Sequence, residues 1–184
     1  MADTKISAMP NASALTGAEF VPVVQSGANV KTTVGDIFTS LAYAEMYIAA
    51  GTASQTTSST PNTFTKLTCF ATNSLSNNCT PDQANDRVTI IQGGVYQVQF
   101  YCTFTNSNNK TFSFRLFNES TATAYANTVV KSTTTTTNPL FLAYSAIVAI
   151  GSGESIIVQV ACATASETII VSDANISVIQ VSPA

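Results

Sequence analysis

The residue types that most often carry enzyme chemistry are scarce in this sequence. No histidine occurs among the 184 residues, which removes the commonest general base and the commonest metal ligand. Without histidine, the Ser–His and Cys–His pairs that activate nucleophiles cannot form within the chain. Gly93-Gly94 precedes an expected strand rather than a helix, so it does not resemble a phosphate-binding loop. We therefore expect no catalytic residues and no enzyme activity.

The four cysteines are Cys69, Cys79, Cys102 and Cys162, and their spacing does not match that of zinc ligands. Cys102 and Cys162 lie in alternating apolar runs, and we interpret them as small buried hydrophobic side chains. Cys69 and Cys79 flank a stretch rich in Asn and Ser, and the sequence leaves open whether they form a disulfide. Synthesis in a reducing cytosol favours free thiols.

The closest pair of carboxylates is Asp82 and Asp86, within the stretch Thr80–Arg87. Calcium takes loop oxygens of this kind as ligands, but solvated turn charges are the explanation that we favour. We expect no metal and no cofactor.

The composition is apolar and nearly uncharged. Hydrophobic residues make up 45% of the chain and charged residues 9%, against about 25% charged in typical domains. The net charge of −3 and seven scattered Lys and Arg argue against a nucleic-acid partner, whose phosphates need a clustered basic face. No apolar run reaches the roughly 18 residues of a membrane span, and the first residues do not resemble a signal peptide. We expect neither nucleic acid nor membrane as a partner.

Residues 43–184 alternate between apolar and polar positions, which indicates strands. In the clearest run, Gly94–Phe104, the side chains of Tyr96, Val98, Phe100, Cys102 and Phe104 share one face. Further strands are expected at 112–116, 140–150, 156–162, 168–171 and 176–181. Short strands with frequent turns predict an antiparallel sandwich or barrel.

Two of these runs, 140–150 and 176–181, are apolar on both faces. In a domain of two sheets, one face of each strand normally meets water. The pattern therefore predicts that a second copy of the chain covers the outer face. Coverage by the chain's own N-terminal arm is the alternative.

Residues 1–42 have a different character and are expected to form an arm, a hairpin and a short helix. Phe20–Val24 and Val30–Thr33 are the two strands of the expected hairpin, separated by a polar turn. Thr33–Asp36 is similar to a helix capping box and predicts a helix over Val34–Leu41. A hairpin this small is marginal in water, so we expect it to pack against another surface.

The strand Gly94-Val95-Tyr96-Gln97-Val98 resembles the Gly-x-Tyr-x-apolar strand of tumour-necrosis-factor-like jelly rolls, the fold of complement globular heads. The resemblance implies a mainly β, antiparallel jelly-roll sandwich over residues 43–184 and a homotrimer with an apolar, aromatic-rich axis. On this basis, combined with the two doubly apolar runs, we expect the trimer interface to contain Tyr96, Ile147, Ile176 and Val178.

The N-terminal segment resembles a recurring N-terminus of tailed-bacteriophage fibre and head-decoration proteins. The matching stretches are Lys5–Pro10, Ala14–Gln25 and Thr32–Ile37. In such proteins the segment is thought to attach varied C-terminal modules to the particle. The resemblance implies that residues 1–42 bind the capsid, and the expected attachment residues are Leu15, Phe20, Val21, Val23, Val24 and Ile37.

Three functions remain open at this stage. The leading hypothesis is a homotrimeric head fibre or decoration protein at the virion surface, with itself and the major capsid protein or another virion protein as partners. The second is a tail-fibre or receptor-binding tip that recognises a host-surface ligand. The third is a soluble ligand-binding or adhesive jelly roll. The chain has no heptad or collagen-like repeat that would form a shaft, which favours decoration over a long fibre.

Overall fold

The computed structural model describes most of the chain. The described residues are 20–25, 28–33, 41–48, 51–106, 109–126, 129–134 and 138–183, and for the first two ranges the description covers the backbone alone. The chain divides into two compact units, Met1–Leu41 and Ala42–Ala184. The boundary expected from the sequence lies one residue later.

In the first unit, two strands form an antiparallel hairpin. Strand β1 (Phe20–Gln25) pairs with β2 (Ala28–Thr33), so that Phe20 lies opposite Thr33 and Gln25 lies opposite Ala28. This is the hairpin that the sequence predicts. The helix predicted over Val34–Leu41 falls on residues 34–40, which lie outside the described residues, and on Leu41.

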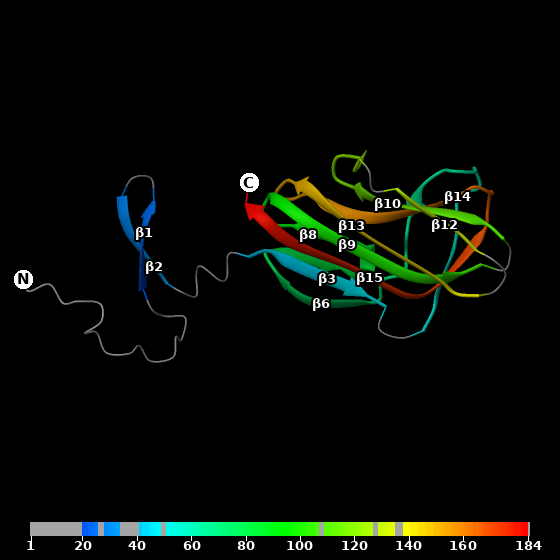
Figure 1. The fold of residues 1–184 in the computed structure, drawn as a ribbon, viewed down its shortest axis with the longest axis horizontal. Helices are drawn as coiled ribbons and strands as arrows, with labels where there is room; N and C mark the ends of the chain where they lie inside the picture. Colours follow the sequence, from blue (N-terminus) through cyan, green and yellow to red (C-terminus); the bar gives the residue numbers. More distant parts are fainter. Residues whose placement is uncertain are drawn as a thin grey trace, which may run out of the picture. The chain divides into compact units, whose positions relative to one another are not determined.

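The described residues of the second unit form strands joined by turns and one short 3₁₀ helix, η2 (Gln83–Asn85) (Figure 1). The strands are β3 (Tyr43–Tyr47), β4 (Ala53–Thr56), β5 (Thr65–Lys66), β6 (Thr72–Asn77), β7 (Cys79–Asp82), β8 (Arg87–Ile90), β9 (Gly94–Thr105), β10 (Thr111–Asn118), β11 (Thr123–Ala124), β12 (Val130–Thr133), β13 (Leu140–Ile150), β14 (Ser155–Cys162) and β15 (Thr168–Pro183).

These strands form two sheets that pack face to face. The first, here called the β9 sheet, has the order β13-β9-β15-β3-β6, with β4 also paired to β15. The second, the β14 sheet, has the order β11-β10-β14-β8-β7, with β12 on β10 and β5 on β14. The pairings within both sheets are antiparallel. The predicted antiparallel sandwich is confirmed.

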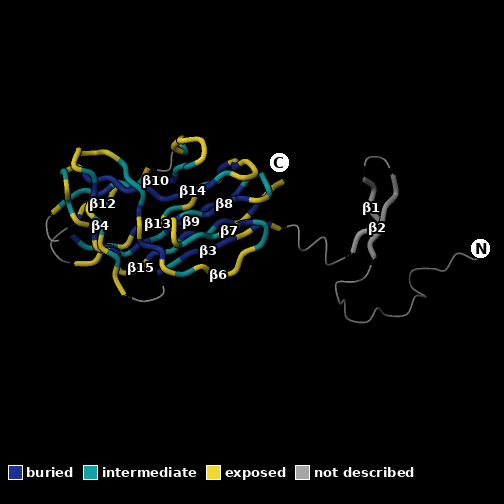
Figure 2. Tube along the Cα trace, turned by 180° about the vertical axis from the view of Figure 1, so that it is seen from behind, coloured by how far each residue is buried: buried dark blue, intermediate teal, exposed yellow. Residues whose placement is uncertain are grey.

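The core lies between the two sheets and is rich in aromatic rings. Burial alternates along β9 and along β10, as a period of two requires for strands with one inward face. The ring of Phe104 lies 5.7 Å from that of Phe112 and 5.2 Å from that of Phe114, and Phe100 lies 6.0 Å from Phe114. Buried positions run along the strands, and exposed positions gather in turns and at the ends (Figure 2). The aromatic face predicted for Gly94–Phe104 is therefore the core face.

The C-terminal strand differs from the sequence-based expectation. The runs 168–171 and 176–181 belong to one strand, β15, which pairs with β9 along its length. Irregularities in its register fall between Val171 and Asp173 and between Gln180 and Ser182. These bulges accommodate the polar residues that suggest a turn in the sequence, and they shift which residues face inward.

The Gly-x-Tyr motif has a structural role at the start of β9. A Cβ atom on Gly94 would lie 2.5 Å from the carbonyl oxygen of Ser182 and 2.5 Å from Nε2 of Gln180. The hydroxyl of Tyr96 donates to the carbonyl oxygen of Gln92, and its side chain is fully buried. Glycine is thus needed for the close approach of β15, and the tyrosine fills the core at this end.

Candidate functional site

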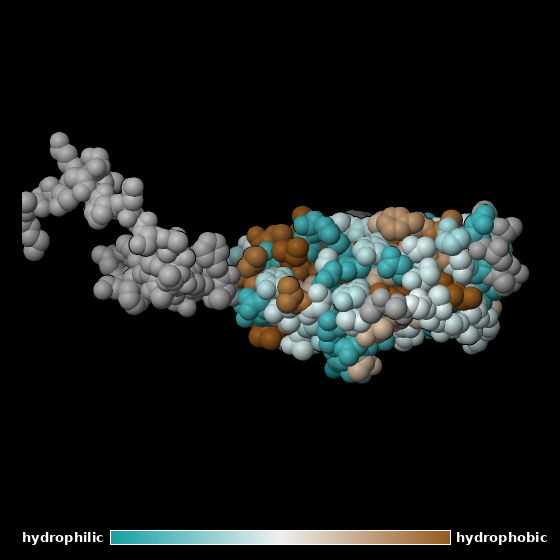
Figure 3. Space-filling view, turned by 90° about the horizontal axis from the view of Figure 1, so that it is seen from below, coloured by the Kyte–Doolittle hydropathy of each residue, from teal (hydrophilic) through white to brown (hydrophobic). Residues whose placement is uncertain are grey.

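The exposed large hydrophobic residues of the second unit are the first candidates for a binding surface. Ile147 is 71% exposed and Phe141 is 67% exposed, although both belong to the long strand β13. Other exposed large hydrophobic residues of the β9 sheet are Tyr43 of β3, Leu75 of β6, and Ile170, Ile179 and Val181 of β15. Figure 3 shows hydrophobic residues grouped at one end of the side that it displays. Exposed apolar side chains that gather on one surface mark an interaction site.

Strand register brings four outward-facing residues into one row across the β9 sheet. Ile147 lies opposite Gln97, Gln97 opposite Ile179, and Ile179 opposite Tyr43. Side chains directly opposite each other on one face are close enough to make contact. The row therefore combines three large apolar or aromatic side chains with one uncharged amide.

A second group lies on the same face, further along β9 and β13. The rings of Tyr101 and Phe141 are 6.0 Å apart. The small residues Ala143 and Ser145 line a depression of about 270 Å³, next to Tyr101. The outward-facing residues Tyr43, Tyr101, Phe141, Ile147 and Ile179 are called the apolar face from here on.

The charges that accompany the apolar face are all acidic within the described residues. Glu45 and Asp173 line a second depression, of about 350 Å³, together with Tyr101 and Asn175. The side-chain amide of Asn175 donates to Oε1 of Glu45 at 2.5 Å. Burial, with smaller contributions from Asp173 and Glu45, raises the pKa of the Tyr101 hydroxyl. No described Lys or Arg forms an ion pair with either carboxylate.

The structure separates the four residues expected at the trimer interface. Ile147 lies on the apolar face. Tyr96 and Val178 are 0% exposed and Ile176 is 1% exposed, because all three point into the core of a single protomer. The expectation that these three side chains meet a partner is therefore corrected: they fill the sandwich.

For Tyr96, the sequence itself contains a signal that the side chain faces the core. Tyr96 alternates in phase with Phe100 and Phe104, so its face is the aromatic core face, and the opposite face carries Gln97 and Tyr101. Phe141 is likewise in phase with Ile147 on β13. For β15 the inward phase is set by the bulges, which the sequence pattern does not reveal.

The residues expected to bind the capsid are only partly described. Leu15 and Ile37 lie outside the described residues. Phe20, Val21, Val23 and Val24 belong to β1, where the backbone alone is described. Their role in attachment stays a prediction.

Asp82 and Asp86 have structural partners around η2. Oδ2 of Asp82 accepts from Nε of Arg87 at 3.1 Å, and Oδ1 caps η2 through the backbone N–H of Asn85. Asp86 has a left-handed backbone (φ 48°), and its Oδ1 accepts the backbone N–H groups of Cys69 and Phe70 at 3.0 and 2.9 Å. Burial raises the pKa of Asp86. The two carboxylates thus organise a turn.

The cysteines are buried thiols, and Cys69 and Cys79 are not joined by a disulfide. Burial raises the pKa of the Cys79 thiol to about 11, and it raises those of Cys69 and Cys102 further. Such thiols are poor nucleophiles at neutral pH, because the thiolate is the reactive form. In the described part of the chain, no three Cys, Asp or Glu residues are grouped as metal ligands would be.

Among the described residues, no helix has the length and hydrophobicity needed to cross a bilayer. No family model and no curated protein matches the chain.

Solved structures do match the fold. The structure of Eiger TNF from S. frugiperda aligns with a TM-score of 0.57 and 11% identity, covering 78% of this chain and 93% of that one. The globular domain of the zebrafish complement 1qA protein aligns with a TM-score of 0.53 and 8% identity, covering 78% and 98%. Murine APRIL at pH 5.0 aligns with a TM-score of 0.55 and 10% identity, covering 77% and 99%. The chain therefore has the jelly-roll fold of tumour necrosis factors and complement globular domains.

Proposed function

We propose that this chain is a non-enzymatic structural protein of a tailed-phage particle. In this proposal it is a homotrimeric decoration protein of the head, attached to the shell by residues 1–42. The observation that carries the proposal is the apolar face, because a second surface must cover side chains such as Ile147 and Phe141.

The apolar face supports self-association for two reasons. Its large side chains are exposed in one protomer, and removing them from water stabilises an interface in proportion to the apolar area buried. In addition, the chain has few charges to keep identical molecules apart. The trimeric state follows from the resemblance of Gly94–Val98 to trimer-forming jelly rolls, and the fold is consistent with it.

The first unit supports attachment to another protein. A two-stranded hairpin buries too little apolar surface to be stable alone, and β1 and β2 pair with each other. Its sequence also resembles the attachment segments of phage fibre and decoration proteins. A shell protein would provide the additional surface.

The decisive experiment compares the full chain with a variant that lacks residues 1–41. Each is mixed with particles that lack this protein, and bound protein is measured by co-sedimentation. We expect the shortened chain to remain folded and trimeric but to leave the particles undecorated. Decoration at full occupancy by the shortened chain would disprove attachment through the first unit.

A milder variant tests the same segment without deleting it. Val23→Asp places a charge in β1, and we expect it to weaken binding to particles while the oligomeric state stays unchanged. Gold labelling of bound protein then locates it on the particle. Label at the head supports decoration, whereas label at the tail tip would replace this proposal with the receptor-binding alternative.

A further inference from the structure

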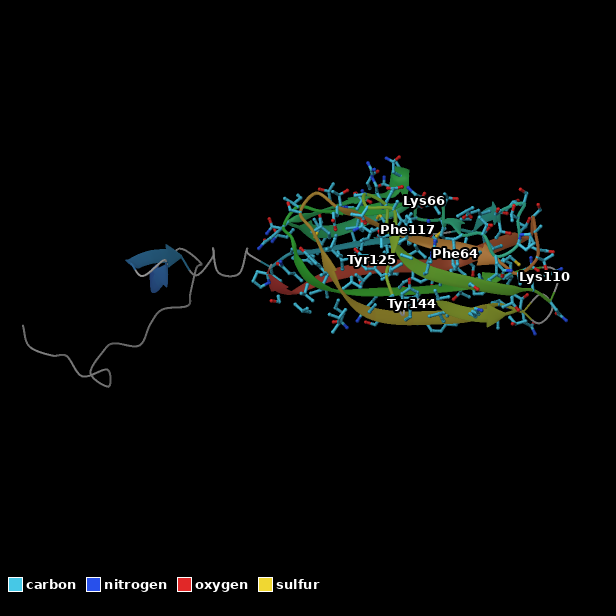
Figure 4. All side chains as sticks on the ribbon, turned by 90° about the horizontal axis from the view of Figure 1, so that it is seen from above. Phe64, Lys66, Lys110, Phe117, Tyr125 and Tyr144 are labelled. Atoms are coloured by element: carbon cyan, nitrogen blue, oxygen red, sulfur yellow. The ribbon has the colours of Figure 1, made fainter. Side chains whose placement is uncertain are left out.

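The outer face of the β14 sheet carries a cluster of aromatic and basic side chains. Arg115 and Phe117 lie two positions apart on β10 and therefore share a face. Gln159 of β14 lies opposite Arg115, and Phe64 precedes β5. These four residues are called the Arg115 cluster. Figure 4 labels Phe64 and Phe117, with Lys66 nearby.

The guanidinium of Arg115 is held in place by its neighbours. Its Cζ lies 4.0 Å from the ring centroid of Phe64 and 5.3 Å from that of Phe117. Its Nε donates to Oε1 of Gln159 at 2.8 Å. Ring contacts and one hydrogen bond thus fix the plane of the group, so a ligand would not have to order a flexible side chain.

Arg115 differs from Lys66, Lys110 and Arg87 because no carboxylate neutralises it. Lys66 pairs with Glu119, and Lys110 pairs with Glu167 at 2.9 Å. Arg87 has two partners: its Nε donates to Asp82 at 3.1 Å, and its Nη1 lies 3.7 Å from Glu119. Within the described residues, Arg115 forms no ion pair, although it is half-buried.

Burial also affects the protonation of this cation. It lowers the pKa of Arg115, and no nearby carboxylate offsets the effect. A half-buried charge without a counterion is a costly arrangement. An anion that binds the guanidinium would relieve that cost, and the described residues place no acceptor on its two terminal nitrogens.

We propose that the Arg115 cluster binds the carboxylate of an acidic sugar, with the sugar ring against Phe64 and Phe117. A guanidinium pairs with a carboxylate through two parallel hydrogen bonds. Partly exposed aromatic rings present a flat apolar surface that suits the C–H face of a sugar. The hydroxyl of Ser113, in phase with Arg115 on β10, adds a polar group for the sugar hydroxyls.

A sugar acid suits this surface better than an acidic peptide does. The cluster lies on the open face of a sheet, and apolar peptide side chains would need a pocket to be buried. Ser113 and Ala161 lie opposite each other beside the cluster. The strand register also places Lys66 opposite Gln159 and Lys131 opposite Ser113, and their positive charges favour an anionic ligand. The site is also on a different sheet from the apolar face, so it stays available when that face is covered.

The test uses the full chain labelled with ¹⁵N. Only two arginines occur, Arg87 and Arg115, so the side-chain Nε–Hε spectrum has one signal for the site and one internal control. Glucuronate is titrated into the protein, with glucose and acetate as separate arms. We expect glucuronate to shift the Arg115 signal in a saturable way and to leave the Arg87 signal unchanged.

Variants separate the contributions of the guanidinium and the ring. Arg115→Lys keeps the charge but loses the planar donor pair, and we expect glucuronate binding, followed through the backbone amides of β10, to weaken roughly tenfold or more. Phe117→Leu should weaken it by a smaller factor. Arg87→Lys is the matched control and should leave binding unchanged.

Several outcomes would overturn the proposal. These are the absence of a saturable shift of the Arg115 signal in the wild-type protein, an equal response to glucose, and an equal affinity for acetate. An equal affinity of acetate would mean that the sugar ring is not recognised. Because the wild-type titration needs no substitution, the result does not depend on the folding of any variant.

Discussion

The outer faces of the two sheets differ in how far their outward side chains are buried. On the β14 sheet, the outward residues Ile157, Gln159 and Ala161 of β14 are buried, at 3%, 9% and 2% exposure. On the β9 sheet, Ile147 and Phe141 remain 71% and 67% exposed. The outer face of β14 is thus covered within one protomer, whereas that of β13 is exposed in one protomer.

The distribution of charge follows the same division. The ion pairs of the second unit join residues such as Lys66, Arg87 and Glu119, outside the apolar face. The apolar face is accompanied by Glu45 and Asp173 alone among the described charged residues. Charges at the centre of an interface oppose association when they lack partners. The proposed self-association would therefore use the β9 sheet, with the β14 sheet facing solvent.

The largest effect on self-association is expected from a charge placed on the apolar face. We expect Ile147→Asp to abolish self-association, because burying an unpaired carboxylate at an apolar interface costs about 3 kcal/mol or more. Sedimentation equilibrium measures the oligomeric state, and circular dichroism verifies that the variant is folded.

The matched control places the same charge on an exposed apolar residue elsewhere. Val129 is 50% exposed and precedes β12, on the β14 sheet. We expect Val129→Asp to keep the oligomeric state of the wild-type protein. If Ile147→Asp remains oligomeric at the same concentrations, the apolar face is not the assembly surface.

The second largest effect concerns the turn that holds the β14 sheet. Asp86→Ala removes the acceptor of two backbone N–H groups, those of Cys69 and Phe70. Leaving two donors unsatisfied costs about 2 kcal/mol or more in free energy of unfolding. Asp86→Asn keeps an acceptor and tolerates the left-handed backbone, so its cost should be less than half as large. Urea unfolding at fixed protein concentration measures both.

Asp86 also gives this prediction a pH dependence. Burial raises the pKa of Asp86 in the folded state, so the folded protein holds that proton more tightly than the unfolded chain does. Stability contributed by the protonated carboxyl is present below the ordinary pKa of about 3.9 and is lost as the pH rises through the folded value. The Asn variant should therefore gain stability relative to wild type as the pH rises. A relative loss would mean that the N–H bonds outweigh burial.

Local patterns predicted the fold well because they follow directly from strand geometry. The alternation in Gly94–Phe104 predicted a strand with one aromatic face, and two short β-prone runs separated by a polar stretch predicted the β1–β2 hairpin. Contacts between residues far apart in sequence were not predictable in this way. The stacking of Phe64 on Arg115 and the N–H bonds of Phe70 to Asp86 depend on how loops cross the sheets.

The candidate site was predicted in part. The run 140–150 is a strand, as predicted, and Ile147 is exposed on its outer face. The coverage of that face by a second copy stays a prediction. Ile176 and Val178 were assigned to the wrong side because the bulges of β15 set its phase. Tyr96 was assigned to the trimer interface because its motif resembles that of trimeric jelly rolls. Its position in the alternating pattern of β9 instead indicates the core.

A third prediction tests the close contact that the Gly-x-Tyr motif allows. In Gly94→Ala the added Cβ would approach the carbonyl oxygen of Ser182, which is backbone and cannot move easily. We expect a loss of about 1–3 kcal/mol in free energy of unfolding. Gly151→Ala is the control, because its Cβ would meet the flexible carboxylate of Glu154 at 3.0 Å. Equal losses in the two variants would show that β15 does not constrain Gly94.

The smallest expected effect concerns the acidic residues beside the apolar face, Glu45 and Asp173. If the apolar faces of identical copies come together, the carboxylates of Glu45 and Asp173 are brought nearer to one another, and like charges repel. Glu45→Gln removes one charge per copy, while the amide oxygen can still accept from Asn175. We expect assembly to tighten by roughly two- to threefold, and by less at high salt, because salt screens the repulsion. Sedimentation equilibrium at two salt concentrations measures this change.

Weaker assembly of Glu45→Gln would mean that Glu45 pairs with a cation of the neighbouring copy. Lys131 is then the first candidate, because it is exposed and forms no ion pair within the described residues. Lys131→Ala would in that case weaken assembly by a similar factor, and the comparison would have to include a contact between the two kinds of face.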